Sequence, residues 1–283
     1  MLTKKIFFAQ NVMPKPVDPP DPDPGEAIIN PCAIDTQVHP RWNDGGHNVW
    51  GEDWFRADSA GEIGFAALPG GYRWSSGSFG SLGAIGYWWS STEHSSALAW
   101  SRFMLHSYGD VARSRSNKAS GFSLRCVRNA TQTEIDNDVD GEVYVDDYED
   151  GDGNTYDGVK IGNQIWTKTN LKTTHYQSGL VAINTGLSDS DWENTTDGAY
   201  AIYPHSLVSG IDSDAEMIAA YGLLYNWYAI DGLVDDNGYR VPTDDDWTQL
   251  TDYLKDEYSA NGIDSSNVAL PLKSCRQVNH PEA

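Results

Sequence analysis

The side chains that most often perform catalysis are scattered along this chain and form no recognised motif. The seven histidines are spread from His39 to His280. The sequence contains no His-Glu-x-x-His zinc motif, no Gly-x-Ser-x-Gly nucleophile motif and no phosphate-binding glycine loop. Folding could bring His39, His47 and His94 together, but their spacing matches no metal-binding motif. We therefore expect no enzymatic activity and no metal site.

An acidic run offers a different kind of ligand site. Residues 136–141 read Asp-Asn-Asp-Val-Asp-Gly and resemble the start of an EF-hand calcium loop, in which oxygen ligands alternate along the chain. Asp147 stands in the twelfth place, where such loops usually carry Glu, and no helical pattern flanks the run. We expect no cofactor and favour a solvated linker that ends in a strand, with calcium as the alternative.

The charge of the chain is strongly negative, because 41 Asp and Glu face 19 Lys and Arg, giving a net charge of −22. Such a charge repels phosphate backbones and anionic lipids, so we expect no binding to nucleic acid or to membrane surfaces. Residues 73–128 are the exception, with seven Lys and Arg against Glu93 and Asp110. Residues 131–158 hold eleven acids and no base, which is typical of a solvated connector.

Composition divides the chain into four segments. Within residues 1–30, Pro and Asp alternate at positions 19–24, a pattern that predicts an extended tether. Residues 31–129 and 151–283 have folded composition, and residues 130–150 form the acidic linker. Lys4-Lys5 with the short apolar run 6–9 resembles the start of a secretory signal, but it is too short to be convincing. No run approaches the length of a membrane helix, so we expect no membrane insertion.

Local patterns predict an α+β fold with a mixed, mostly antiparallel sheet, two helices and long irregular loops. Short apolar runs between Gly, Ser and Pro predict strands near residues 65–68, 87–91, 99–105, 111–115, 121–128 and 159–166. A helix is predicted from about Ser213 to Ile230, and a second one begins after Thr243, a good N-cap. The apolar stripes of the two helices are Met217, Tyr221, Leu224 and Tyr228, and Trp247, Leu250, Leu254 and Tyr258.

Several motifs resemble those of the Fibrobacter succinogenes major paralogous domain. Its opening half is similar to residues 152–156, 159–166, 169–172, 221–229, 240–244 and 272–275, and its closing half to residues 64–73, 86–93 and 121–128. The resemblance covers roughly 230 residues, within the size of one domain. It implies a C-type-lectin-like fold related to formylglycine-generating-enzyme-type lectin modules. It also implies a bacterial or phage protein at the cell surface, outside the cell or on a phage particle.

The order of the two halves departs from the family, because the closing half comes first here. We therefore expect a circularly permuted domain in which residues 31–128 dock onto residues 151–283, since neither half alone would cover its aromatic surfaces and strand edges. Exchange of halves between chains and a truncated gene are the alternatives. The resemblance implies a disulfide between Cys32 and Cys275, with two free buried thiols as the alternative. Cys126 is expected to be a small core residue in a strand.

The resemblance also points to a ligand-binding surface. Related lectin-like domains include the variable proteins of diversity-generating retroelements, in which mutation of adenines changes selected codons. Residues 78–121 resemble such a variable region. The candidate ligand-binding residues are Phe79, Ser81, Ile85, His94, Leu98, Ser101, Phe103, Leu105, His106, Ser107, Asp110, Ala112, Ser114 and Ser116.

Strand alternation supports that surface independently. Ser101, Phe103 and Leu105 alternate with residues of the opposite face, so we expect them to be exposed. With His106, and with Arg113 and Arg115 nearby, they would form a partly apolar, basic patch. The alternative is an ordinary solvent-facing surface.

Three hypotheses of function follow. The first is a non-catalytic recognition protein, expected as a monomer, that binds a protein or glycan ligand through residues 79–120. The second is a surface or fibre component that assembles by swapping half-domains between chains. The third is a formylglycine-generating-type enzyme, for which only the fold would argue.

Overall fold

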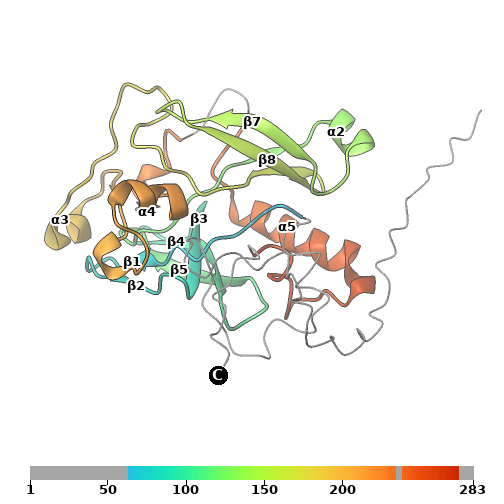
Figure 1. Cartoon of the computed structure of the whole chain (residues 1–283), viewed down its shortest axis with the longest axis horizontal. Helices are drawn as coiled ribbons and strands as arrows, with labels where there is room; N and C mark the ends of the chain where they lie inside the picture. Colours follow the sequence, from blue (N-terminus) through green and yellow to red (C-terminus); the bar gives the residue numbers. More distant parts are fainter. Residues whose placement is uncertain (1–62, 234–237, 274–283) are drawn as a thin grey trace, which may run out of the picture.

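Short strands alternate with a few helices along the chain (Figure 1). The computed structural model describes residues 63–233 and 238–273. All strand pairs in its sheets are antiparallel, which confirms the predicted α+β class with mostly antiparallel sheet. The strands are β1 (Tyr72–Arg73), β2 (Phe79–Gly80), β3 (Ile85–Glu93), β4 (Leu98–Leu105), β5 (Ala112–Asn117), β6 (Val127–Asn129), β7 (Val143–Glu149), β8 (Thr155–Ile161), β9 (Gln164–Thr167), β10 (Tyr200–Ala201) and β11 (Leu224–Tyr225). The helices are α2 (Gln132–Asn137), α3 (Asp189–Asn194), α4 (Asp214–Tyr221) and α5 (Asp244–Glu257), with the 3-10 turns η1 (His205–Leu207), η2 (Trp227–Ala229) and η3 (Ser259–Asn261).

A three-stranded sheet in the order β3-β4-β5 occupies the centre of the view (Figure 1). The pairing places Tyr87 opposite Phe103, and Phe103 opposite Ala112. Residues directly opposite each other share a face of the sheet, so this register decides which side chains lie together. The predicted strands at 87–91, 99–105 and 111–115 correspond to β3, β4 and β5.

A four-stranded sheet in the order β6-β9-β8-β7 combines residues from both sides of the acidic segment. Val127 in β6 pairs with Trp166 in β9, which pairs in turn with Val159 in β8. The turn between β8 and β9 contains Gly162 at φ 59°, a left-handed conformation that suits glycine in a tight hairpin. Residues 63–127 and 159–272 share one apolar core around this sheet.

Helix α5 forms as its sequence predicts. The Thr243 hydroxyl accepts a hydrogen bond from the backbone N–H of Asp246, and the Asp246 side chain accepts one from the backbone N–H of Thr243. Trp247, Leu250 and Leu254 of the predicted stripe are buried against the four-stranded sheet. The capping residues therefore set where the helix begins, and the stripe sets which face is buried.

The prediction of one helix from Ser213 to Ile230 is correct for about two turns and wrong for the rest. Helix α4 ends at Tyr221, and Gly222 follows at φ 76°. The chain then forms β11 and η2, so Leu224 and Tyr228 do not continue a helical stripe. The run 65–68 contributes only one isolated bridge, and of the run 121–128 only the last residues enter a named strand, β6.

The acidic segment 130–150 contains more secondary structure than the predicted linker. It forms α2 and the edge strand β7. Arg128 forms ion pairs with Glu134 and Asp147, and the pKa of Glu134 is held at about 2, chiefly by its hydrogen bonds with Arg128. Asp138 accepts a hydrogen bond from the Tyr144 hydroxyl instead of facing a common centre. In the described part of the chain, no three His, Cys, Asp or Glu side chains form a group that could hold a metal ion.

The two ends of the described chain lie side by side. The backbone N–H of Ala67 donates to the carbonyl of Leu272 at 2.7 Å, and Ala67 forms a parallel bridge with Lys273. The residues of the expected disulfide, Cys32 and Cys275, lie outside the described ranges. Cys126 is fully buried, as expected of a core residue, just before β6. Within residues 63–233 and 238–273, no helix has the length and apolar character needed to cross a bilayer.

The ammonium group of Lys273 makes this junction sensitive to pH. It is buried and donates hydrogen bonds of 2.6 Å to the carbonyls of Leu105 and Tyr108. Burial lowers the pKa of Lys273 to about 7, partly opposed by Asp110. Above that pH the folded chain gives up a proton that the unfolded chain retains, so rising pH favours folding by up to about 1.4 kcal/mol per pH unit.

We predict that Lys273→Met flattens the pH dependence of stability. Urea unfolding of the wild-type protein should show a free energy of unfolding that rises, relative to the variant, by about 1–2 kcal/mol from about pH 7 to about pH 9. Lys255→Met, on the outer side of α5, should keep the wild-type dependence. Parallel curves for the wild-type and Lys273→Met proteins would refute the prediction.

Candidate functional site

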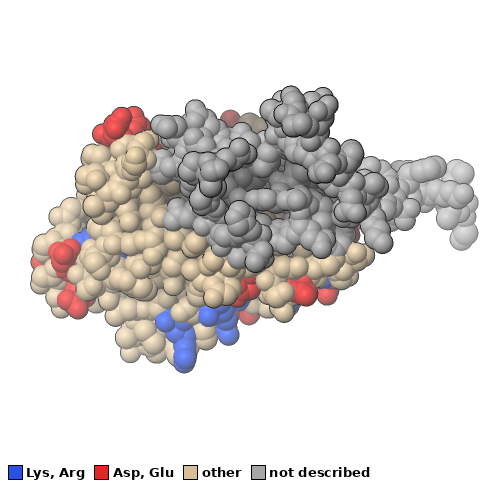
Figure 2. Space-filling view, turned by 60° about the horizontal axis from the view of Figure 1, so that its bottom comes forward, with Lys and Arg blue, Asp and Glu red and all other residues tan. Residues whose placement is uncertain are grey.

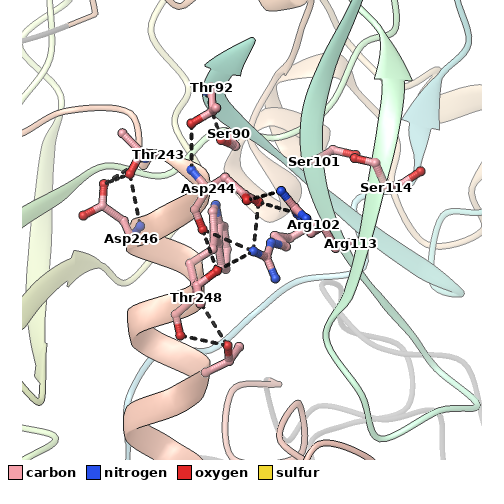
Figure 3. Close-up of polar contacts among 12 residues, drawn as sticks. Ser90, Thr92, Ser101, Arg102, Arg113, Ser114, Thr243, Asp244, Asp246 and Thr248 are labelled. Atoms are coloured by element: carbon pink, nitrogen blue, oxygen red, sulfur yellow. Dashed lines mark hydrogen bonds and ion pairs between the residues drawn. The ribbon is translucent and has the colours of Figure 1, made fainter. Parts of the chain in front are cut away.

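The sheet β3-β4-β5 presents two different faces, and the first one packs on α5. Trp88 and Met104 on this face belong to the core cluster that includes Trp247. At the edge of that core, Asp244 at the start of α5 lies between Arg102 of β4 and Arg113 of β5 (Figure 3). This face therefore joins the sheet to the helix through both apolar and ionic contacts.

The ionic contacts around Asp244 are short and mostly shielded from water. One Asp244 oxygen accepts from Nη2 of Arg102 at 2.8 Å and from Nε of Arg113 at 3.1 Å. The other lies 2.6 Å from Nη2 of Arg113. Desolvation lowers the pKa of Arg102, and the Asp244 carboxylate opposes that shift. Thr92 of β3 accepts a hydrogen bond from the backbone N–H of Asp244, so all three strands reach the helix start.

Trp100 completes this cluster on the solvent side. The guanidinium carbon of Arg113 lies 3.4 Å from the centre of the Trp100 ring, and His94 meets the ring edge-on at 4.9 Å. These contacts hold Arg113 between an aromatic ring and a carboxylate. The cluster is therefore an anchor between sheet and helix, in which Arg102 and Arg113 share the Asp244 carboxylate.

The second face of the sheet carries half of the candidate ligand-binding residues. Strand register places on it Ile85, Ser101, Phe103, Leu105, Ala112, Ser114 and Ser116. Ser101 and Ser114 lie on the side of the strands that faces away from α5 (Figure 3). Alternation along β4 thus separates the candidate residues from the α5 anchor, as the sequence predicts.

One end of this second face is covered, which corrects the expected exposure of Ser101. Ser101 and Ser116 are buried, and their hydroxyl groups lie 2.9 Å apart. The Trp89 ring packs against Phe122 with centroids 4.5 Å apart, and its indole N–H donates to the carbonyl of Tyr225. Segments distant in sequence therefore close this end, and the two serines do not face solvent.

The other end of the face is open and aromatic. We call the rings of Tyr72, Trp74, Tyr87 and Phe103 the aromatic face. Tyr72 contacts Trp74 at 4.2 Å and Tyr87 at 5.7 Å between ring centroids, and Tyr87 contacts Phe103 at 4.9 Å. Tyr87 also stacks on buried Phe122 at 4.5 Å, so the core fixes the position of the row. Trp74 is 41% exposed and the other three rings are half-buried.

Among the described residues, the four rings of the aromatic face offer the hydroxyl groups of Tyr72 and Tyr87 and are themselves uncharged. The Ser81 hydroxyl donates to the Tyr72 hydroxyl at 3.3 Å. Burial raises the pKa of Tyr87, and the neighbouring Tyr72 raises it further, so the Tyr87 hydroxyl stays neutral well above physiological pH. The surface can therefore offer ring faces and edges together with neutral hydrogen-bonding groups.

The expectation of a mixed apolar and basic patch is wrong. Arg113 pairs with Arg102 in the register and lies on the α5 side, opposite to Phe103. Arg115 pairs with Trp100 and so shares the α5 side. Figure 2 shows Lys and Arg side chains gathered at the lower edge of one face, with Asp and Glu around the margins. Arg113 and Arg115 are therefore separated from Phe103 and the aromatic face by the thickness of the sheet.

The other candidate residues divide into two groups. Ser81, His106, Ser107 and Asp110 lie in loops next to the strands, and the backbone N–H of His106 donates to the carbonyl of Ala84. Phe79, His94 and Leu98 lie away from the aromatic face: Phe79 packs against Tyr203, and Leu98 pairs with Asn117 at the start of β4. The ligand-binding role of all fourteen remains a prediction.

Three residues of the aromatic face were not among the candidates, namely Tyr72, Trp74 and Tyr87. Tyr72 and Trp74 flank Arg73, whose buried side chain pairs with Asp189 and lies over the Trp192 ring. Their spacing of two residues could have indicated a shared surface, because in an extended chain residues two apart lie on the same side. Tyr87 lies directly before Trp88 and Trp89, which are buried. Three adjacent aromatic residues give no sequence pattern that tells which of them is exposed.

Comparison with known proteins gives one match. A family model described as the Fibrobacter succinogenes major domain matches residues 45–128 and 159–278. The matched segments include β3, β4, β5 and α5, and therefore both faces of the three-stranded sheet. No curated protein and no solved structure matches this chain.

Proposed function

Because this chain belongs to the Fibrobacter succinogenes major domain family, we propose that it is a ligand-recognition protein whose binding surface is the aromatic face. The observation that carries the proposal is the row from Trp74 through Tyr72 and Tyr87 to Phe103, held in place by stacking on the core. Aromatic rings that are fixed before binding lose little conformational freedom on contact with a ligand. Such rings are frequent anchors of recognition surfaces.

The proposed fold is C-type-lectin-like, with its two halves in circularly permuted order. The contact between Ala67 and Leu272 supports this order, because it brings the last described residues beside the first. In the unpermuted order the chain would pass from one of these segments to the other. The shared core around Trp88, Trp166 and Trp247 supports closure within one chain.

We further propose that residues 79–120 include positions diversified by a retroelement. Phe103, Leu105 and Ala112 are half-buried on the face turned away from α5. Arg102 and Met104 are buried on the α5 side. Changes at the first three positions would alter the binding surface and leave the anchor to α5 intact, which is the separation that a diversified protein needs.

The ligand we propose is a protein or a glycan. The four rings of the aromatic face are uncharged, which argues against a polyanionic ligand, as does the net charge of −22. Ring stacking with neutral hydrogen bonds suits apolar protein side chains and the carbon–hydrogen faces of sugars equally.

The proposal predicts that Trp74→Ala/Phe103→Ala weakens ligand binding. Glycan and protein arrays probed with the wild-type chain should identify ligands, and the double variant should bind them at least about tenfold more weakly, because truncated anchors typically cost more than 1.4 kcal/mol. Leu180→Ala, which removes a largely exposed apolar side chain elsewhere, serves as the matched control and should bind normally. Undiminished binding by a folded double variant would reject this surface.

A further inference from the structure

The apolar face of the four-stranded sheet extends beyond the helix that covers it. Val127, Trp166 and Val159 lie opposite one another on β6, β9 and β8 and are buried against α5. Val143 of β7 pairs with Val159, so it continues the same face, yet it is 38% exposed. Val145 stands two residues further along, where the pairing of β7 with β8 becomes irregular between Tyr144 and Tyr148, and it is 74% exposed. Figure 1 shows β7 as the outer strand of its hairpin, while α5 runs along the sheet further in.

The surroundings of these valines are apolar and acidic. Val139 is 69% exposed and lies in the turn that leads into β7, where the backbone N–H of Glu142 donates to its carbonyl. Glu142 and Asp146 are exposed beside the valines, whereas the nearby cations Arg128 and Lys160 are paired with other acids, namely Glu134, Asp147 and Asp140. We call Val139, Glu142, Val143, Val145 and Asp146 the β7 edge.

The backbone of β7 also leaves one side unpaired among the described strands. β7 is the last strand in the order β6-β9-β8-β7 and pairs there only with β8. Acids on an edge strand discourage pairing with a second acidic strand. That role alone would be served by polar residues at positions 143 and 145, whereas this chain exposes valines there. Apolar contact and negative charge occur together at the β7 edge.

We propose that the β7 edge is a docking site for an extended basic segment of a partner protein with alternating apolar and Lys or Arg side chains. Such a segment would pair with the free edge of β7, extend the apolar face over Val143 and Val145, and place its cations near Glu142 and Asp146. Charge complementarity selects this occupant over a second copy of the chain, which would bring the same acids to the contact. This site is separate from the aromatic face and does not depend on the function proposed for it.

Fluorescence anisotropy with synthetic peptides tests the proposal on the full chain. An octapeptide of alternating Lys and Val should bind at least about tenfold more tightly than one of alternating Lys and Ser with the same charge, and added salt should weaken its binding. Val143→Thr/Val145→Thr, which keeps strand-forming side chains, should reduce binding at least about fivefold. Leu180→Thr/Val181→Thr, with two exposed apolar residues changed elsewhere, should not. Glu142→Gln/Asp146→Asn should reduce both the affinity and its dependence on salt.

Several outcomes would overturn the proposal. Equal binding of the two peptides would show attraction by charge alone, and no binding of either would show that the edge is closed. Unchanged binding by a folded Val143→Thr/Val145→Thr variant would place the contact elsewhere. Sedimentation of the wild-type protein, but not of this variant, as a dimer would make a second copy the occupant.

Discussion

Replacement of Arg125 by Met is expected to lower the free energy of unfolding by about 3–5 kcal/mol. The Arg125 side chain is fully buried, and burial lowers its pKa to about 9, so the guanidinium is still a cation at neutral pH. It donates hydrogen bonds to the carbonyls of Phe65, Ala66 and Thr167 and to the side chain of Asn170. Met fills a similar volume but removes the donor to the carbonyls of Phe65, Ala66 and Thr167, while Asn170 still accepts from the Trp88 indole. Each buried carbonyl that stays dry costs about 1–3 kcal/mol.

The position of Arg125 makes this loss global. Phe65 and Ala66 lie near the start of the described chain, whereas Thr167 ends β9 and Asn170 follows it. The guanidinium therefore joins residues from both sides of the acidic segment at one point. Without it we expect the two parts to separate more easily, so the transition should become less cooperative as well as earlier.

Chemical unfolding followed by tryptophan fluorescence provides the measurement for Arg125→Met. Trp88 and Trp89 precede the acidic segment and Trp166 and Trp247 follow it, and all four are fully buried, so emission reports on both parts. Arg115→Met is the matched control, because Arg115 is exposed on β5 and should change stability by no more than about 0.5 kcal/mol. Similar losses in both variants would mean that charge, and not the buried hydrogen bonds, determines the effect.

Asp244→Asn is expected to lower the free energy of unfolding by about 3 kcal/mol. The substitution keeps the shape of the side chain but removes the negative charge that both Arg102 and Arg113 contact. Arg102 would then be a cation in a shielded position without its carboxylate, which is more costly than an uncharged side chain there. Because Asp244 opens α5, the link from β4 and β5 to that helix would weaken together with the ion pairs.

The neighbouring residue offers a control for Asp244→Asn. Asp245→Asn removes the same charge from the same helix turn, but Asp245 is exposed, so the expected loss is about 0.5 kcal/mol from the helix dipole alone. Thermal unfolding of both variants at the same pH and salt compares the two positions directly. Equal losses of unfolding free energy in the two variants would show that the ion pairs of Asp244 contribute no more to stability than the helix dipole does.

Where neighbouring residues determine the structure, the sequence was informative. Helix α5 could be located because Pro242, Thr243 and the acids that follow define a helix start, and its stripe defines the buried face. The side on which Phe103 and Leu105 lie followed from alternation along β4. These features depend on spacing alone, so no knowledge of distant segments was needed.

Where contacts between distant segments determine the structure, the sequence did not predict it. The pattern from Met217 to Tyr228 is periodic enough for one helix, but the left-handed turn at Gly222 ends it. Ser101 is buried because Phe122 and Tyr225 pack beside Trp89, and no local pattern carries that information. By sequence, the acids of residues 131–158 indicate a solvated connector. The structure instead shows Arg128 paired with both Glu134 and Asp147.

The bridge between Ala67 and Lys273 has a mechanical consequence. The two segments run parallel there, and the N–H of Ala67 donates across to Leu272. Tension that pulls backwards on the residues before Ala67 and forwards on those after Lys273 would slide the segments along each other instead of peeling them apart. The hydrogen bond from Ala67 to Leu272 would therefore be loaded in shear, along the direction of the two segments.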